Sequence, residues 1–347
     1  MSDISVRKSG HAGRITLTRP KALNAVTYEM CQAIEAALDA WQDDDDIALV
    51  IIDAEGDKAF SAGGDIQKLY ETGRAGDFGY GQTFWADEYR LNAKIHEYSK
   101  PYVSFMQGFT MGGGVGVSCH GSHRIVCENS QIAMPECGIG LVPDVGGSLM
   151  LAQAPGRLGE YLGMTCARMG PADAIFVGFA DTYIPAEDWS ALIQRLEETG
   201  DINAIGALAQ DAPTGSLAAQ QAQIDALFGG DSLIDILNAL RADDSDFATA
   251  TLKALSRNSP LSMACAVEMT HRLRRPGTTI RDALELEYRF TYRAMEHGDF
   301  LEGIRAAVID KDRSPNWQHD LDNPPALAAT KMLMPLGEHK LTFDAKG

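Results

Sequence analysis

Hydrophobic and polar residues follow two different patterns along the chain. In the first half, apolar residues form short unbroken or alternating runs, such as the segment 47–52, which are typical of strands. Beyond residue 185 they recur at intervals of three or four positions, which predicts amphipathic helices. The pattern therefore predicts a strand-and-helix region over residues 1–185 and a helical region over residues 186–347.

The same pattern places the individual elements. A hairpin around Ser9-Gly10-His11 is expected, and the predicted strands are 4–7, 14–18, 47–52, 103–106, 124–127 and 181–184. Helices are expected after Thr27, from Pro171, and at 82–99, 147–164 with a break at Pro155-Gly156, 187–198, 218–228, 232–241, 247–257, 262–274, 278–297 and 301–308. The segment 73–81 and the tail from Trp317 are predicted to be irregular. Strands that alternate with helices predict an α/β fold of ββα units with largely parallel strands.

The segment 104–147 carries the most informative residues. Three consecutive glycines, Gly112–Gly114, follow an apolar strand and open a helix of small residues, which leaves backbone N–H groups free. Two acids, Glu136 and Asp144, each stand next to a proline among apolar residues. Carboxylates in such surroundings are candidates for a nucleophile or a general base.

A second glycine turn precedes this segment. Gly63-Gly64 lie between a strand and a helix that is expected to start near Asp65, whose side chain can cap that helix. Two such turns can place their N–H groups around one oxygen atom as an oxyanion hole. Because glycines after strands mostly serve only the turn, the spacing leaves both interpretations open.

Charge and composition exclude several kinds of partner. Lys and Arg number 30 against 48 Asp and Glu, and the formal net charge of −18 argues against nucleic acid and anionic membranes. No apolar run reaches the ~20 residues of a membrane span. The N-terminus lacks the features of a signal or transit peptide, so a cytoplasmic location is expected. The six cysteines are scattered without a CxxC pair, so we expect neither a metal site nor a disulfide framework.

Several motifs together give the chain a resemblance that covers nearly its whole length. They are Arg19–Ala25, Ala59–Ile66, Glu88-Tyr89, Leu91-Asn92, Lys100–Tyr102, Thr110–Gly116, Met134–Glu136, Pro143–Gly147, Glu287–Arg289, Asp299–Ala306 and Asp310–Asp312. On these motifs the chain resembles the crotonase (enoyl-CoA hydratase/isomerase) superfamily and, within it, the 3-hydroxyisobutyryl-CoA hydrolases. The glycine motifs are specific to the superfamily, whereas the Pro143–Gly147 motif and the C-terminal motifs are specific to the hydrolase branch.

The resemblance implies a crotonase-like spiral of ββα units with a C-terminal α-helical region that helps to close the acyl site. It also implies an oxyanion hole formed by the N–H groups of Gly64 and Gly113. Glu88, Gly113, Glu136 and Asp144 are then expected to line the acyl site, although by its pattern alone Glu88 is an ordinary surface acid. Coenzyme A is part of the implied substrate, with no separate cofactor. Since superfamily members are often trimers or hexamers, a homo-oligomer is a further option.

One departure from the superfamily bears on the reaction. Hydratases that resemble this chain activate water with two glutamates, of which the second matches Glu136 and the first falls at Gly116. Asp144 stands where hydratases usually carry glycine. Without one of the two glutamates, the addition of water to a C=C bond loses half of its acid–base groups. Hydrolysis of an acyl-CoA thioester is therefore favoured.

The hydrolysis hypothesis gives each site residue a role. The thioester carbonyl is expected between the N–H groups of Gly64 and Gly113. Glu136 either attacks the carbonyl to form a mixed anhydride or activates water, while Asp144 orients water or binds the 3-hydroxyl group. Glu88 is expected to contact that hydroxyl or the other acids. The acyl group is 3-hydroxyisobutyryl, as in valine breakdown, or 3-hydroxypropionyl or a related short chain. The alternatives are an enoyl-CoA hydratase or isomerase and a non-catalytic acyl-CoA-binding protein.

Overall fold

The computed structural model describes residues 3–343, which form two compact units whose segments alternate along the sequence. Unit 1 contains the described residues up to Asp65, Arg90–Ala133 and Arg168–Ala218. Unit 2 contains Ile66–Tyr89, Met134–Ala167 and the described residues from Ala219 onward. All described strands lie before residue 185, whereas unit 1 extends to Ala218. The last described strand therefore ends near residue 185, whereas the compact unit that contains the strands ends at Ala218.

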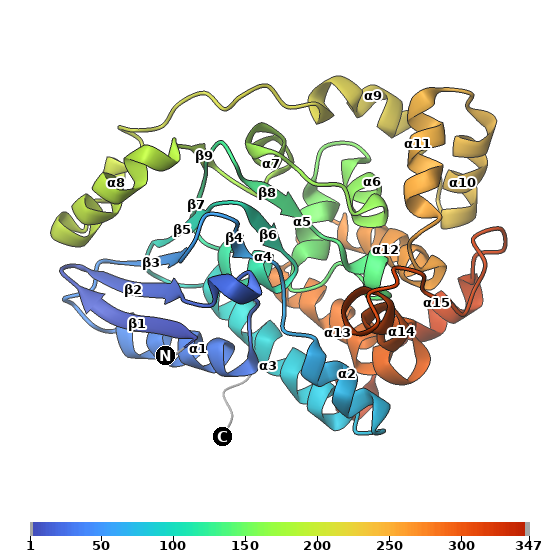
Figure 1. The fold of residues 1–347 in the computed structure, drawn as a ribbon, viewed down its shortest axis with the longest axis horizontal. Helices are drawn as coiled ribbons and strands as arrows, with labels where there is room; N and C mark the ends of the chain where they lie inside the picture. The colour runs from blue at the N-terminus through green and yellow to red at the C-terminus, as the bar shows by residue number, and fades with distance from the viewer. Residues whose placement is uncertain (1–2, 344–347) are drawn as a thin grey trace. The chain divides into compact units, whose positions relative to one another are not determined.

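Unit 1 contains two sheets. The larger has the order β1-β2-β3-β5-β7-β9 and is parallel except for the β1–β2 hairpin, and the smaller, β4-β6-β8, is parallel throughout (Figure 1). The strands are β1 Ile4–Ser9, β2 Ala12–Leu17, β3 Leu49–Ala54, β4 Ala59–Ser61, β5 Tyr102–Met106, β6 Phe109–Met111, β7 His123–Val126, β8 Gln131–Ala133 and β9 Thr182–Tyr183. The hairpin prediction is confirmed. The strands of the smaller sheet were not predicted, because three residues are too few to show a period.

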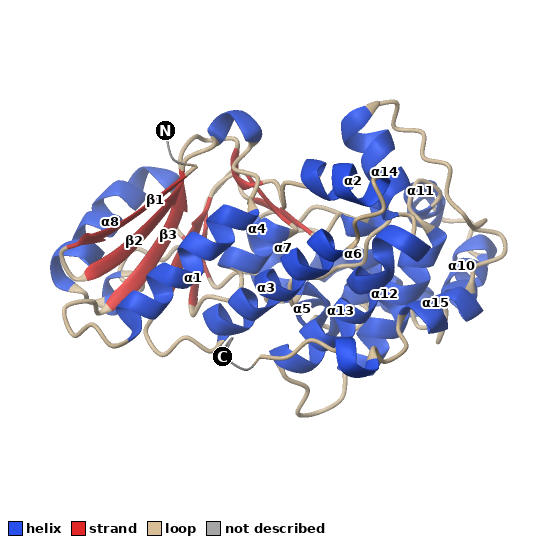
Figure 2. Cartoon of the chain, turned by 90° about the horizontal axis from the view of Figure 1, so that it is seen from below, coloured by secondary structure: helices blue, strands red, loops and turns tan. Residues whose placement is uncertain are grey.

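Helices α1 (Tyr28–Gln42) and α8 (Ala186–Thr199) lie on either side of the larger sheet (Figure 2). Leu192 and Leu196 of α8 belong to one buried cluster with residues of β2, β3 and β5. On the other face, an added Cβ atom at Gly13 of β2 would come within 2.3 Å of the Trp41 ring of α1. Because successive side chains on a strand point to opposite faces of the sheet, alternate buried residues pack against α1 and α8. The remaining helices of unit 1 are η1 Pro20–Ala22, α4 Gly113–Ser118, α7 Pro171–Val177 and η3 Ile202–Ala204.

Unit 2 consists of helices in which α12 and α13 make most of the packing contacts. Helix α12 packs against α5, α6 and α15, and α13 packs against α5, α14 and α15. The helices are α2 Gln67–Arg74, α3 Gly79–His96 with its first part in this unit, η2 Glu136–Ile139, α5 Gly147–Gln153, α6 Leu158–Thr165, α9 Leu217–Leu227 with all but its first residues in this unit, α10 Leu233–Ala242, α11 Asp246–Leu255, α12 Pro260–Leu273, α13 Ile280–His297, α14 Phe300–Ile304, the π-helix η4 Arg305–Ile309, α15 Ala326–Met332 and η5 Gly337–His339. The helices predicted between residues 218 and 304 are confirmed within a few residues.

Three local predictions were wrong. Helix α2 begins at Gln67, and Asp65 does not cap it but accepts a hydrogen bond from Arg19 at 3.1 Å. The same helix runs to residue 74, into the segment predicted to be irregular. The tail contains α15, whose last residue, Met332, accepts a hydrogen bond from Arg293 of α13 at 2.9 Å. Contacts with distant residues, which a local pattern does not record, stabilise these segments.

Helix α14 fixes the position of η2 within unit 2. An added Cβ atom at Gly303 of α14 would come within 2.0 Å of the carbonyl oxygen of Ile139. Gly140, which follows η2 with a φ of 74°, lies against the backbone of Asp299. Glycine permits both the left-handed conformation and the close approach of the two backbones.

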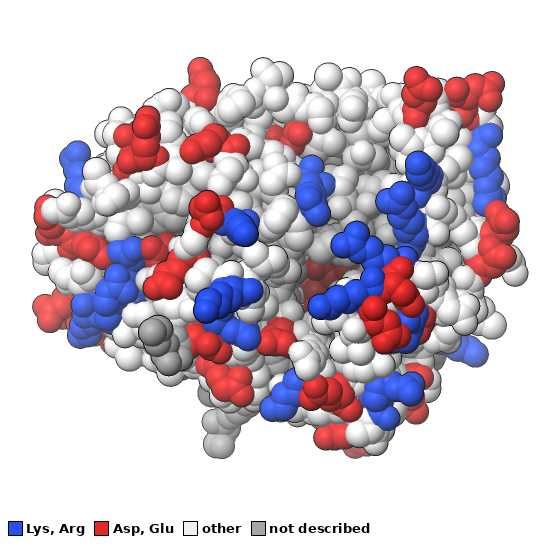
Figure 3. Space-filling view, viewed as in Figure 1, with Lys and Arg blue, Asp and Glu red and all other residues white. Residues whose placement is uncertain are grey.

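The charge distribution on the surface and the character of the helices are relevant to the predictions about nucleic acid and membranes. Acidic and basic side chains are interspersed over the face shown in Figure 3. Between residues 3 and 343, no helix combines the length and the apolar character that crossing a membrane requires.

We expect Gly303→Ala to lower the free energy of unfolding by about 1–3 kcal/mol, because the new methyl group must displace the backbone of η2. Urea unfolding followed by circular dichroism measures the change. Gly206→Ala is the control, since an added Cβ atom there meets only Asn203 O at 3.7 Å and should change stability by less than about 0.5 kcal/mol. Equal stabilities for the two variants would contradict the close packing of α14 on η2.

Candidate active site

Unit 1 brings the two glycine turns together. Strands β4 and β6 are parallel neighbours, so the turns that follow them, Gly63-Gly64 and Gly112–Gly114, leave the same edge of the smaller sheet. Helix α4 packs closely on β4, because an added Cβ atom at Gly114 would come within 2.7 Å of the Ser61 carbonyl oxygen. Glycine is therefore required here for packing as well as for the turn.

Two backbone N–H groups at these turns are free to bind a ligand. The bridge to Val26 uses the Gly63 carbonyl and the Asp65 N–H, each at 2.8 Å, so that within the described residues the Gly64 N–H has no hydrogen-bond partner. Gly113 is the first residue of α4, and its N–H therefore has no partner inside the helix. The donors implied for the oxyanion hole thus lie on neighbouring turns of unit 1.

Unit 2 contains four buried acids whose charges act on one another. Glu88 lies on α3, Glu136 opens η2, Asp144 lies in the turn before α5, and Glu287 lies on α13; none is more than 4% exposed. The first three are the acids that the resemblance implies for the acyl site. The surface position that the pattern alone gives Glu88 is wrong. Among residues 3–343, no group of three or more His, Cys, Asp or Glu side chains is arranged to hold a metal ion.

The four acids act on one another electrostatically. Burial raises the pKa of Asp144 from 3.8 to about 7. Burial, together with the charge of Asp144, raises the pKa of Glu287 to about 8, although hydrogen bonds from Ser148 and Gly146 lower it. Burial and the charges of the neighbouring acids raise the pKa values of the remaining two, Glu88 and Glu136, well above their usual range. Because close like charges disfavour full ionisation, the cluster holds protons at neutral pH and titrates as one group.

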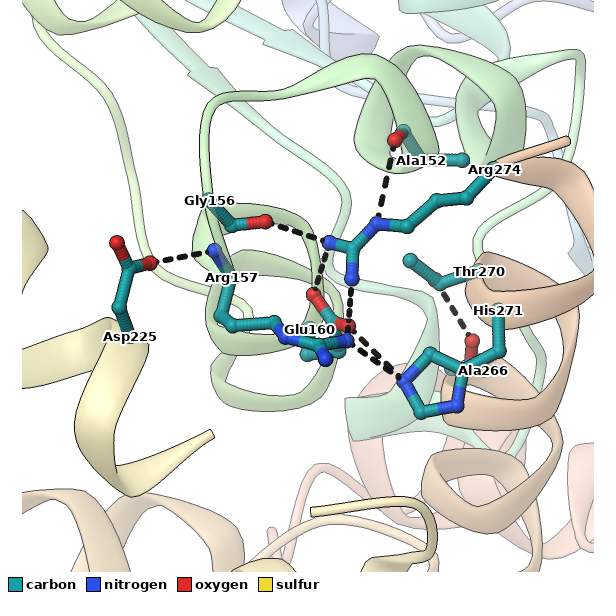
Figure 4. Close-up of polar contacts among 9 residues, drawn as sticks. All are labelled: Ala152, Gly156, Arg157, Glu160, Asp225, Ala266, Thr270, His271 and Arg274. Atoms are coloured by element: carbon teal, nitrogen blue, oxygen red, sulfur yellow. Dashed lines mark hydrogen bonds and ion pairs between the residues drawn. The ribbon is translucent and has the colours of Figure 1, made fainter. Parts of the chain in front are cut away.

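Glu160 of α6 shows the contrasting behaviour of a structural buried acid. It is 1% exposed and forms ion pairs with Arg157 at 2.9 Å and with Arg274 at 2.5 Å (Figure 4). The His271 ring nitrogen lies 3.0 Å from the same carboxylate. Burial raises its pKa, but the hydrogen bonds from His271 and Arg274 outweigh burial and lower it. The four clustered acids have no cationic partner among the described residues. Buried acids without a cation are costly, which marks the cluster as a candidate active site.

Hydrogen bonds distinguish Asp144 from Glu136. The hydroxyl of Tyr89 on α3 donates to Asp144 Oδ2 at 2.8 Å, which fixes that carboxylate. Glu136 Oε2 is buried, and in the described part of the chain it has no hydrogen-bond partner. A buried carboxylate oxygen usually has a partner, so Glu136 is the acid available to water or substrate.

Sequence reasoning did not find Glu287 or Tyr89 as members of the site. Both belong to motifs that carry the resemblance, but the resemblance implied no role for either. A signal for Glu287 was present, because Ala283, Glu287 and Thr291 follow one another at intervals of four on the buried face of α13. An acid on such a buried face is a candidate for a functional group.

Comparison with known sequences gives consistent matches. The family model for enoyl-CoA hydratase/isomerase matches residues 12–325. The chain is similar to the mitochondrial 3-hydroxyisobutyryl-CoA hydrolase of Xenopus tropicalis, with 41% identity over 328 residues that cover 90% of this chain and 84% of the relative. The corresponding Homo sapiens protein is 35% identical over 328 residues, which cover 91% of this chain and 84% of the relative.

Solved structures share the fold over the whole chain. A structure of an enoyl-CoA hydratase from Rhodobacter sphaeroides 2.4.1 has a TM-score of 0.94 and 56% identity, and covers 99% of this chain and 100% of that one. A carnitinyl-CoA dehydratase from Mycobacterium thermoresistibile has a TM-score of 0.94 and 37% identity, with 100% of both chains covered. These similarities confirm the predicted α/β fold with its helical C-terminal region.

We expect the free energy of unfolding to fall by a few kcal/mol between about pH 5 and pH 8. The folded acids bind protons more tightly than the unfolded ones. Their contribution is therefore complete below the unfolded values and is lost as the pH rises through about 7 for Asp144 and about 8 for Glu287. Urea unfolding at a series of pH values measures this slope. Asp144→Asn should flatten it, and the half-exposed control Glu285→Gln should not. A wild-type stability that rises over this range would contradict the raised pKa values.

Proposed function

The chain belongs to the enoyl-CoA hydratase/isomerase family, and on that premise we propose that it hydrolyses a short-chain 3-hydroxyacyl-CoA thioester, in the first place 3-hydroxyisobutyryl-CoA. One observation carries the proposal: buried acids that have no cationic partner among residues 3–343, Asp144 among them, form a cluster in unit 2. The relatives named 3-hydroxyisobutyryl-CoA hydrolase support the substrate. A place in valine catabolism follows from that substrate and is part of the proposal.

In the proposed reaction, backbone N–H groups bind the oxyanion and carboxyl groups activate water. The N–H groups of Gly64 and Gly113 donate to the thioester oxygen, where negative charge builds up as the carbonyl carbon becomes tetrahedral; losing one such donor typically costs ~3–4 kcal/mol of the barrier. A water oxygen bonds to the carbonyl carbon, the C–S bond breaks, and the proton taken from water passes through a carboxyl group to the coenzyme A sulfur. The products are the free acid and coenzyme A.

Glu136 and Asp144 divide the proton transfers in this proposal. Glu136 has the unpaired carboxylate oxygen, so it takes the proton from water or attacks the carbonyl itself to give a mixed anhydride that water then cleaves. Asp144, held by Tyr89, orients the water or the 3-hydroxyl group of the substrate. Glu88 contacts that hydroxyl or the other acids. A pKa of about 7 for Asp144 suits an acid that both gains and loses a proton near neutral pH.

Hydration of an enoyl-CoA is the second candidate, because the similar structure with 56% identity is described as an enoyl-CoA hydratase. The residues favour hydrolysis over it. Gly116 in α4 stands where the resembling hydratases carry the first of two glutamates, and a glycine has no acid–base group. The fixed carboxylate of Asp144 is the additional acid that the hydrolase branch is expected to have.

We also propose a cytoplasmic location and leave a homo-oligomer as a further option. The curated relatives are named mitochondrial, so cell fractionation with an antibody to the chain is the relevant measurement for the location. Light scattering of the purified protein measures the oligomeric state.

We expect the purified protein to release thiol from 3-hydroxyisobutyryl-CoA and to leave the enoyl absorbance of crotonyl-CoA unchanged. Thiol release is followed with a disulfide dye and hydration by the absorbance, with 3-hydroxypropionyl-CoA as a second acyl group. Hydration without thiol release would support the hydratase instead. Binding of the ester without turnover of either substrate would support a non-catalytic binding protein.

Glu136→Gln should lower kcat by roughly 10²–10⁴-fold and leave KM nearly unchanged, because the amide cannot accept the proton from water. Steady-state thiol release measures both constants. Glu268→Gln is the matched control, since Glu268 lies on α12 with a half-exposed side chain paired to Arg272. Thiol release at the wild-type rate by the Glu136 variant would remove this residue from the mechanism.

A further inference from the structure

Glu287 is a buried acid of unit 2 to which the proposed mechanism gives no role. Its side chain extends from α13 and is 0% exposed. The carboxylate accepts hydrogen bonds from the Gly146 N–H at 2.8 Å, the Ser148 N–H at 3.2 Å and the Ser148 hydroxyl. All three donors belong to the turn that carries Asp144 and to the start of α5.

The backbone of this turn needs such support. Val145 has a φ of 51° and Gly146 a φ of 80°, and the left-handed region is unfavourable for a β-branched residue such as valine. A conformation of this kind persists only where its surroundings fix it. The Gly147 N–H donates to the Asp144 carbonyl at 2.7 Å, which closes the turn, and Glu287 binds the N–H groups on either side of that donor.

Asp144 is consequently held from two elements. Tyr89 of α3 binds its side chain, and Glu287 of α13 binds the backbone that follows it. A neutral acceptor would be enough to bind these N–H groups. A second carboxylate beside Asp144 instead adds the repulsion of like charges, which is unfavourable for stability alone.

We infer that Glu287 is a positioning residue of the proposed hydrolysis, whose carboxyl group holds the Asp144 turn in place and whose charge acts on the ionisation of Glu136. This inference rests on the proposed function and extends it. Glu287 touches no substrate in this role. It acts through the turn, and through its charge on the other acids.

The surroundings of Glu287 contain other acids but no close cation among the described residues. Its charge contributes to the raised pKa values of Glu88, Tyr89 and Glu136, and the charge of Asp144 contributes to its own. Helix α5, packed against α13, contains no charged residue. On α12, α14 and α15, which also pack against α13, the side chains of Glu268, His271, Arg272, Glu302 and Lys331 are at least partly exposed, whereas the thiol of Cys265 on α12 is buried. Helix α3, whose Tyr89 ring lies against the Tyr288 ring of α13, adds the buried acids Asp87 and Glu88.

The test is thiol release from 3-hydroxyisobutyryl-CoA by Glu287→Gln as a function of pH. We expect kcat to fall roughly 100-fold, as for a displaced catalytic group, with KM changed much less. The charge of Glu287 contributes to the raised pKa of Glu136. Removing that charge should lower the pKa of Glu136, so the acid limb of the profile should move to lower pH. Glu285→Gln is the control, because this acid of the same helix is half-exposed and paired with Arg289.

A second variant tests the inference even if Glu287→Gln does not fold. Ser148→Ala removes one of the three donors and leaves the carboxylate, so we expect a several-fold lower kcat with an unchanged KM. Folded variants with the wild-type kcat and pH profile would overturn the inference. A kcat loss without a shift of the acid limb would also overturn the electrostatic part, because a purely structural residue would give that result.

Failure of the proposed hydrolysis can be distinguished from failure of the inference about Glu287. If the wild type and Glu285→Gln release no thiol, the proposed hydrolysis is wrong. The pH dependence of the melting temperature of Glu287→Gln then still tests the charge coupling. A slope equal to that of the wild type would overturn the coupling without reference to any activity.

Discussion

The structure of unit 2 depends on one costly arrangement, the burial of several carboxyl groups that have no cationic partner among the described residues. Moving an ionised carboxylate out of water is unfavourable by several kcal/mol unless a cation or hydrogen bonds compensate. Glu160, in the same unit, has that compensation from Arg157 and Arg274, and its pKa is lowered. Glu136 and Asp144 have no cationic partner among the described residues, and burial raises the pKa of each, although the hydrogen bond from Tyr89 lowers that of Asp144. Such acids hold a proton near neutral pH and can exchange it, which hydrolysis requires.

The surrounding elements hold these acids in place through short-range contacts. Tyr89 binds the Asp144 side chain, Glu287 binds the backbone of the next turn, and Gly303 allows α14 to pack on the 3₁₀ helix that begins with Glu136. Each contact comes from a different helix. Precise positions matter because displacement of a catalytic group by about 1 Å can lower a rate 100-fold.

The hydrophobic periodicity of the sequence predicts much of the fold, but it predicts the candidate active site only in part. The period of two in the strands and the spacing of three to four in the helices predicted the parallel core and the C-terminal helices. The same rules placed Glu88 at the surface, because a polar residue in a helix is usually solvated. Its surroundings include acids far away in sequence, Asp144 and Glu287, whose charges act on it. The glycine turns were visible as spacing, but their adjacency required the pairing of β4 with β6.

The buried acids carry protons at neutral pH because no cation in the described part of the chain neutralises them. Titration of the side-chain carboxyl groups by carbon-13 NMR tests this most directly, with Asp144→Asn to assign one resonance. We predict that the Asp144 carboxyl titrates near pH 7 and that Glu287 follows near pH 8. Titration of all four acids near their ordinary values, with no proton left at neutral pH, would contradict the claim.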